Sequence, residues 1–331
     1  MKNSFLVTLI SLLGFSFFIS CENDLDIVSP YKDTTIVYCL LDLSDSVHWV
    51  RVHKAFLGPG DAEQMAAYAD SIYYSDQLTV KLERWVNNQL YGVINFARDS
   101  SVTKEPGLFA ESPNILYKSY GIDNLFDDSE YRLLITNRKT GKVISAAANM
   151  IQKPFISNPS SGSISLSPGP FNIKLNTGKY AKTYDVKIVF NYIEQSKADS
   201  SLIVNKQTIW NAGVIEAPST DGSQPVTYTL KREEFAQFLK STIKPDPTVY
   251  RYTGKLDFYF AASDNTMFEY QRINNANGVN SGNALLFTNI QGGLGLMACK
   301  RTDVKSGQSL SGQTVLFIQT SPETSNLGFV Q

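Results

Sequence analysis

The feature that most constrains the fold is a series of short runs rich in Tyr, Phe, Val, Thr and Ile, separated by Asn, Gly, Pro, Asp and Ser. The first group of residues is typical of β-strands and the second of turns. Two such runs, residues 78–85 and 90–97, flank the turn residues 86–89 and predict a hairpin. Similar runs recur along the chain, so the sequence predicts a mainly β fold.

The length of the chain and the spacing of these runs indicate two domains. A chain of 331 residues exceeds what one hydrophobic core organises well. About six or seven strands within residues 33–154 predict a β-sandwich of immunoglobulin-like or transthyretin-like shape. Pro, Gly and Ser at residues 154–163 place the boundary near residue 155. Residues 155–331 are then expected to form a β-rich domain with one or two short helices.

Helical patterns occur in this second part of the chain. An apolar stripe at positions i, i+3 and i+4 predicts an amphipathic helix over residues 231–243. Ser263 and Asp264 offer an N-cap for a second helix near residues 267–273. The short apolar run at residues 314–319 is interpreted as the closing strand.

The first residues have the pattern of an export signal. Residues 5–19 are apolar and uncharged and follow Lys2, and they fall short of the roughly 20 residues that span a bilayer as a helix. They predict a secretory signal peptide over residues 1–20. The run Phe18-Ile19-Ser20-Cys21 resembles a bacterial lipobox, which implies that Cys21 is the first mature residue and carries acyl chains such as palmitate. The alternative is a simple secreted protein in which Cys21 is incidental.

Residues 21–32 are expected to form a tether between the lipid and the folded chain. Each buried CH2 of an acyl chain contributes ~0.8 kcal/mol, so more than one chain makes the anchor stable. The acidic residues Glu22, Asp24 and Asp26 resemble the surface-export signal of Bacteroidota lipoproteins, which implies an outer-membrane protein facing the cell exterior. An ordinary solvated tether is the alternative.

Charge and cysteine content argue against several classes of protein. Without Lys2, 29 of the 30 basic residues remain beside 31 acidic residues, a formal charge of −2. With no basic stripe, this balance argues against a nucleic-acid partner. Cys39 and Cys299 have apolar neighbours and are expected to be buried free thiols, with a disulfide left open.

No residues are assigned a catalytic or metal-binding role. His48 and His53 are the only histidines, and their spacing along one expected strand points them to opposite faces. That arrangement suits neither a two-histidine metal site nor a serine triad. The glycine-rich residues 292–295 lack the Lys-Ser/Thr of a phosphate loop, so a tight turn or a close approach of two backbones is expected there.

Two further groups of side chains are weighed as binding sites. Acidic residues cluster at 42–45 and 123–130; for the second cluster a solvated loop is expected and a structural calcium ion is the alternative. Tyr68, at the end of an expected short helix at residues 61–69, and Tyr73 and Tyr74 after it are candidate ligand-binding residues, because rigid aromatic surfaces bind at low entropic cost.

The lipobox, the strand pair at residues 36–41 and 50–54, and the late run Phe287-Thr288-Asn289-Ile290-Gln291-Gly292-Gly293-Leu294-Gly295 together resemble uncharacterised lipoproteins of the Bacteroidota. The resemblance covers most of the mature chain and implies a two-domain β architecture. Many members look like accessories to outer-membrane receptor systems. The resemblance supplies no cofactor and no catalytic residue.

The leading hypothesis is a non-catalytic, lipid-anchored binding or assembly module of the cell envelope, accessory to an outer-membrane receptor or transport system, with its small-molecule or glycan ligand open. The alternatives are an envelope hydrolase that uses carboxylates and a structural or adhesive surface protein. Carboxylates that converge in a cleft would favour the enzyme. An exposed aromatic patch or an unpaired strand edge would favour the binding module.

Overall fold

The computed structural model describes residues 34–55, 66–107, 110–119, 125–160, 162–277 and 287–330. The expected signal peptide at residues 1–20, Cys21 and the tether at residues 21–32 lie outside these ranges, as do Asp123 and most of the expected helix at residues 61–69. Among the helices of the described ranges, none combines the length and apolar character needed to cross a membrane.

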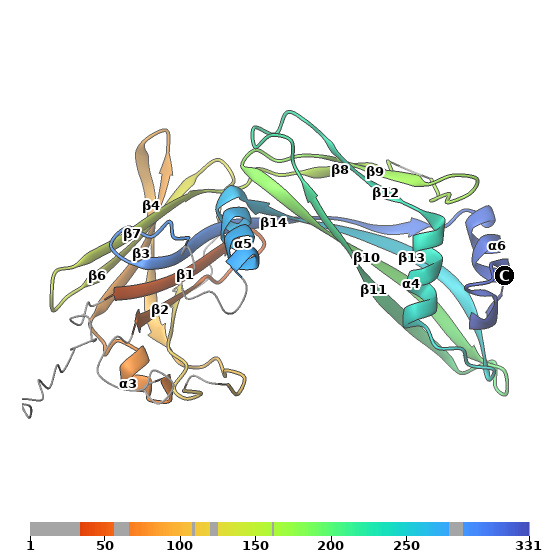
Figure 1. Cartoon of the computed structure of the whole chain (residues 1–331), viewed down its shortest axis with the longest axis horizontal. Coiled ribbons are helices and arrows are strands. Elements are labelled where there is room, and N and C mark those ends of the chain that lie inside the picture. The colour runs from red at the N-terminus through yellow and green to blue at the C-terminus, as the bar shows by residue number, and fades with distance from the viewer. Residues whose placement is uncertain are drawn as a thin grey trace, which may run out of the picture.

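The chain is mainly β, as predicted, and forms two lobes joined by one large sheet (Figure 1). The first lobe contains β1 (Thr34–Asp42), β2 (Trp49–Ala55), α3 (Ala69–Ile72), β3 (Leu78–Val86), β4 (Gln89–Asp99), β5 (Leu116–Ser119), β6 (Glu130–Asn137) and β7 (Val143–Asn149). The hairpin expected at residues 78–97 is confirmed as β3 and β4.

The second lobe is β-rich with helices. It contains β8 (Phe155–Asn158), β9 (Phe171–Asn176), β10 (Ala181–Ser196), β11 (Ile203–Glu216), β12 (Val226–Leu230), α4 (Arg232–Thr242), β13 (Val249–Asp264), α5 (Asn265–Asn277), β14 (Leu294–Ser309), α6 (Gly312–Thr320), η1 (Ser325–Leu327) and β15 (Phe329–Val330). The large sheet has 12 strands in the order β11-β10-β13-β14-β1-β2-β5-β4-β3-β6-β7, with β15 beside β13. A separate sheet has the order β12-β9-β8.

Strand β14 belongs to both lobes. Its first part pairs in parallel with β1, from Leu294 opposite Ile36 to Lys300 opposite Asp42. Its second part pairs antiparallel with β13, from Lys300 opposite Ser263 to Ser309 opposite Lys255. The boundary near residue 155 stays a prediction; it falls where β8 begins, but β14 returns to complete the first lobe.

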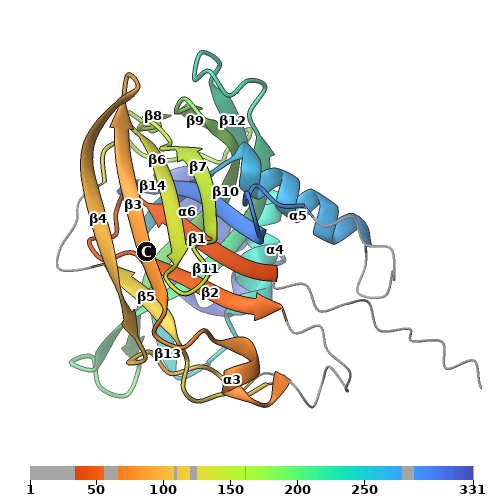
Figure 2. The same cartoon turned by 90° about the vertical axis from the view of Figure 1, so that its left-hand side faces the viewer.

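The first lobe curls around its own core (Figure 2). Ser145 of β7 and Gln291, just before β14, exchange two backbone hydrogen bonds of 3.1 and 2.8 Å. This bridge brings the far edge of the sheet back to the strand that pairs with β1. The curled sheet encloses the fully buried side chains Val37, Val50, Leu82 and Ile135.

Glycines at the start of β14 make this closure sterically feasible. Gly295 has φ +115°, and a Cβ there would lie 1.9 Å from the carbonyl oxygen of Val37. A Cβ on Gly293 would lie 2.6 Å from the carbonyl oxygen of Thr35. The close backbone approach expected for residues 292–295 is therefore confirmed.

The second lobe has a sandwich-like arrangement, in which the small sheet and α4 cover one face of the large sheet (Figure 1). Phe190 of β10 and Phe235 of α4 meet edge to face with ring centroids 5.6 Å apart. Trp210 of β11 stacks on Phe238 of α4 at 5.3 Å. The helix expected over residues 231–243 is thus confirmed as α4, with its apolar stripe buried.

Two further predictions concern helix ends. Asp264 caps α5, because its Oδ1 accepts a hydrogen bond of 2.9 Å from the backbone N–H of Met267. The strand predicted at residues 314–319 is wrong, since these residues lie in α6. Ser311 caps α6 by accepting from the backbone N–H of Thr314 at 3.2 Å. A short apolar run does not distinguish a strand from a helix by its period, whereas the Ser311 cap marks the start of a helix.

Candidate functional site

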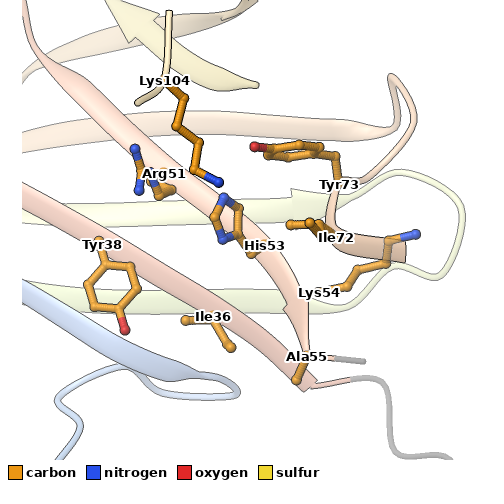
Figure 3. A pocket seen from close by; sticks show the side chains of 9 residues that line it. All are labelled: Ile36, Tyr38, Arg51, His53, Lys54, Ala55, Ile72, Tyr73 and Lys104. Atoms are coloured by element: carbon orange, nitrogen blue, oxygen red, sulfur yellow. The ribbon is translucent and has the colours of Figure 1, made fainter. Parts of the chain in front are cut away.

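A pocket lies on the outer face of β1 and β2, beside α3 (Figure 3). Its volume is about 410 Å³. Side chains alternate between the two faces of a strand, so the neighbours Val37 and Val52 enter the core. The register places Ile36 opposite His53 and Tyr38 opposite Arg51, which brings these four side chains together on the outer face.

The upper wall of the pocket comes from α3 and from a distant loop. Ile72 and Tyr73 are held there by packing against Ile115. The rings of Tyr73 and His53 meet edge to face, with centroids 5.1 Å apart. Lys104 completes this wall from a loop 51 positions after His53 in the sequence.

The lining is rich in positive charge. Its charged side chains are Arg51, Lys54 and Lys104, and among the lining residues that the structure describes there is no Asp or Glu. Lys54 Nζ donates to the carbonyl oxygen of Asp70 at 2.6 Å, and Lys104 Nζ donates to that of Ala110 at 3.3 Å. Within the described residues, no ion pair includes Arg51 or Lys54. The pocket is therefore electropositive.

The side chains of Arg51 and Lys104 both lie beside the imidazole of His53 (Figure 3). Burial, followed by the nearby positive charges of Arg51 and Lys104, lowers the pKa of His53 to about 4. Its buried Nε2 has no hydrogen-bond partner within the described part of the chain. The imidazole is thus neutral at pH 7.

Tyr38 connects the pocket to α5. Burial raises the pKa of Tyr38, and the neighbouring Tyr270, to which it is hydrogen-bonded, raises it further. Tyr270 lies in α5, which also contacts β14. The pocket therefore adjoins the junction between the lobes.

The three tyrosines proposed from the sequence occupy different environments. Tyr73 is buried and lines the pocket. Tyr74 is buried on the core side, where its hydroxyl is 2.7 Å from Thr35 Oγ1. Tyr68 is 67% exposed. Their binding role stays a prediction, and of the three only Tyr73 contributes to this pocket.

Arg51 and Lys104 were not singled out by the sequence. Alternation along residues 50–53 places Arg51 and His53 on one face, so that pair had a usable signal. Lys104 had none, because its approach depends on the path of the chain between β4 and β5. His48, the other histidine, precedes β2 and is buried, with its backbone N–H donating to Ser119 Oγ at 3.0 Å.

The acidic clusters do not converge on a common point within the described residues. Asp127 pairs with Arg301 at 2.6 Å, and Asp128 pairs with Arg84 at 3.0 Å. Asp42 lies 3.3 Å from Lys300 Nζ. Across the described ranges, no group of three or more His, Cys, Asp or Glu side chains is arranged to hold a metal ion.

Cys39 and Cys299 are buried free thiols, as expected. Cys39 of β1 lies opposite Met297, and Cys299 lies opposite Leu41 of β1. Burial raises the pKa of Cys39 to about 12 and also raises that of Cys299. Both side chains are therefore protonated core groups.

No family model matches the chain. No curated protein matches it. A comparison with solved structures finds the crystal structure of the calcium-binding domain CBD12 of CALX1.1, at 10% identity over 80% of this chain and 98% of that chain, with a TM-score of 0.15. A TM-score this low carries no argument about function.

Proposed function

We propose that the protein is a lipid-anchored binding module of the bacterial cell envelope, which docks on a partner protein of the outer membrane. The signal-like residues 1–20 followed by Cys21, and the resemblance to envelope lipoproteins, support the location. The observation that carries the binding role is the open edge of the large sheet at β11.

Strand β11 is the first strand of the large sheet and spans 14 residues. One edge of β11 pairs with β10 from Ile203 to Glu216, and within the described residues no strand pairs with the other edge. Exposed apolar side chains flank this edge: Ile203, Val204, Ile209 and Val214. An edge of this kind accepts a strand from another protein through backbone hydrogen bonds, while apolar side chains provide contact area.

Two features of β11 partly protect its edge against pairing with other strands, and they leave most of the edge open. Gly213 has φ +115°, and the register with β10 shifts there, which interrupts regular pairing near the end of β11. Lys206 lies 3.8 Å from Glu194, so its charge is partly balanced. The segment between these residues, centred on Ile209, is the docking site that we propose.

An affinity pull-down from native membranes with the tagged full chain tests this proposal. The expected result is one stoichiometric outer-membrane protein, identified by mass spectrometry. Ile209→Lys should reduce its recovery by at least tenfold, because a charge would be buried at the interface. Leu316→Lys, at a 58% exposed apolar position on α6, is the matched control and should retain the partner. Recovery of the chain alone, or equal loss with both variants, would refute docking at β11.

The anchor has its own test. Cys21→Ala removes the acylation site, so the chain should move from the membrane fraction to the soluble fraction after cell disruption and a high-salt wash. Ser20→Ala is the matched control and should stay with the membrane. If Cys21→Ala also remains there, the lipid anchor is wrong.

A further inference from the structure

We infer that the pocket between β2 and α3 binds a small organic carboxylate. The acidic group would lie beside Arg51 and Lys104, and an apolar body would pack on Ile36, Ile72 and Tyr73. This inference goes beyond the proposed docking at β11, because it concerns a different site of the chain.

The charge of the lining favours an anion. Arg51, Lys54 and Lys104 surround one cavity, and no carboxylate is present in the described part of its lining. The three positive charges repel one another, and the apolar part of the lining screens this repulsion less than water does. A bound anion instead attracts all three charges. The planar guanidinium of Arg51 has the geometry to donate two parallel hydrogen bonds to a carboxylate.

The state of His53 points in the same direction. A histidine at the centre of the cavity remains neutral because it is partly buried and because Arg51 and Lys104 oppose a further positive charge. Its buried Nε2 lacks a hydrogen-bond partner in the described part of the chain, and leaving such a group unsatisfied costs about 1–3 kcal/mol. A carboxylate in the pocket offers an acceptor and lowers the local positive potential.

The remaining walls suit the apolar part of a ligand. Ile36, Ala55 and Ile72 present aliphatic groups, and Tyr73 presents the side of an aromatic ring. The volume of about 410 Å³ lies within the range typical of small-molecule sites. The floor consists of two paired strands, so the positions of Arg51 and His53 are fixed before a ligand arrives.

The two histidines of the chain provide the assay. Full-length chain in detergent, labelled with ¹⁵N-histidine, should give signals from His53 in the pocket and from His48 outside it. The probes are 3-phenylpropionate, its neutral analogue 3-phenylpropanamide, and inorganic phosphate. We expect 3-phenylpropionate to shift the His53 signal saturably and leave His48 unchanged. The amide and phosphate should each bind at least tenfold more weakly, because one lacks the charge and the other the apolar body.

Arg51→Gln should weaken 3-phenylpropionate binding by at least tenfold, and Arg232→Gln, on the exposed side of α4, should leave it unchanged. An unperturbed His48 signal verifies that each variant is folded. If Arg51→Gln does not fold, Lys104→Gln replaces it with the same expectation. No saturable shift of His53, or equal affinity for the acid and the amide, would overturn the inference. The pull-down result is independent of these titrations, so failure here leaves the proposed docking at β11 intact.

Discussion

Replacing Gly295 with alanine should strongly destabilise the protein, because this residue sets how closely β14 approaches β1. Its φ of +115° lies where L-residues with a side chain are strained. The added Cβ would also lie 1.9 Å from the carbonyl oxygen of Val37 and 2.9 Å from the Val37 nitrogen. These are backbone atoms of a central strand, so no side-chain rotation relieves the contact.

The magnitude follows from two contributions. The backbone conformation costs about 1–3 kcal/mol for a non-glycine residue. Moving β14 away from β1 also weakens at least one or two neighbouring hydrogen bonds of the parallel ladder, at roughly 1 kcal/mol each. We therefore expect a loss of about 2–5 kcal/mol, a large part of the stability of a typical domain.

Urea unfolding of the purified protein, followed by circular dichroism, measures this loss. Gly307→Ala is the matched control on the same strand, with φ +74° and only the flexible Lys255 side chain, at 3.9 Å, near the new Cβ. It carries the backbone cost without the backbone collision, so we expect a loss of about 1–2 kcal/mol. If Gly295→Ala is no less stable than Gly307→Ala, the close approach of β14 and β1 does not constrain the fold as argued.

Three further outcomes follow from buried charged or titratable groups. Arg251 is 3% exposed and lies 2.8 Å from Glu194, so Arg251→Gln should cost about 3 kcal/mol in urea unfolding. Arg232, whose side chain is 39% exposed in its ion pair with Glu233, is the control, and Arg232→Gln should cost about 0.5 kcal/mol or less. Equal costs of the two substitutions would contradict the stabilising role of the buried pair. Burial raises the pKa of Asp264 to about 6, above its value of 3.8 in the unfolded chain. The contribution of Asp264 to the free energy of unfolding is therefore fully present below pH 3.8, and up to about 3 kcal/mol of it is lost as the pH rises through 6. Asp264→Asn should abolish that loss. The pKa of His53 is lowered to about 4, so its contribution to the free energy of unfolding is full above pH 6.5, and up to about 3 kcal/mol is lost as the pH falls through 4. Urea unfolding midpoints measured between pH 4 and 7 should show that His53→Gln removes this acid sensitivity. An unchanged pH profile would refute the lowered pKa of His53.

Local patterns were sufficient for most of the strands and for two helices. Two runs of strand-favouring residues around a turn placed β3 and β4, and the stripe of apolar residues placed α4, because both signals depend on residues a few positions apart. The run at residues 314–319 was misassigned for the same reason: it is too short for its period to separate a strand from a helix. Ser311 and its hydrogen bond to Thr314 were the missing information.

The candidate site was only partly visible in the sequence. His53 was considered and Tyr73 was proposed, but each in a different context from the one found. The alternation of side chains determines which face of β2 carries Arg51 and His53, but it does not specify which other part of the chain covers that face. The approach of Lys104 and α3 depends on how the segment between β2 and β5 folds back over the strands.

By itself, the sequence determined the mainly β class, the close backbone contact of residues 292–295, and the buried free thiols, because each depends on residue chemistry within a short window. Tertiary structure alone decided that β14 serves both lobes and that its first part lies parallel to β1. Such pairing joins residues more than 250 positions apart, and no local period specifies which strand becomes the neighbour of another. The electropositive pocket depends on the same kind of long-range packing, because its charges become a site only where β2, α3 and the loop of Lys104 meet.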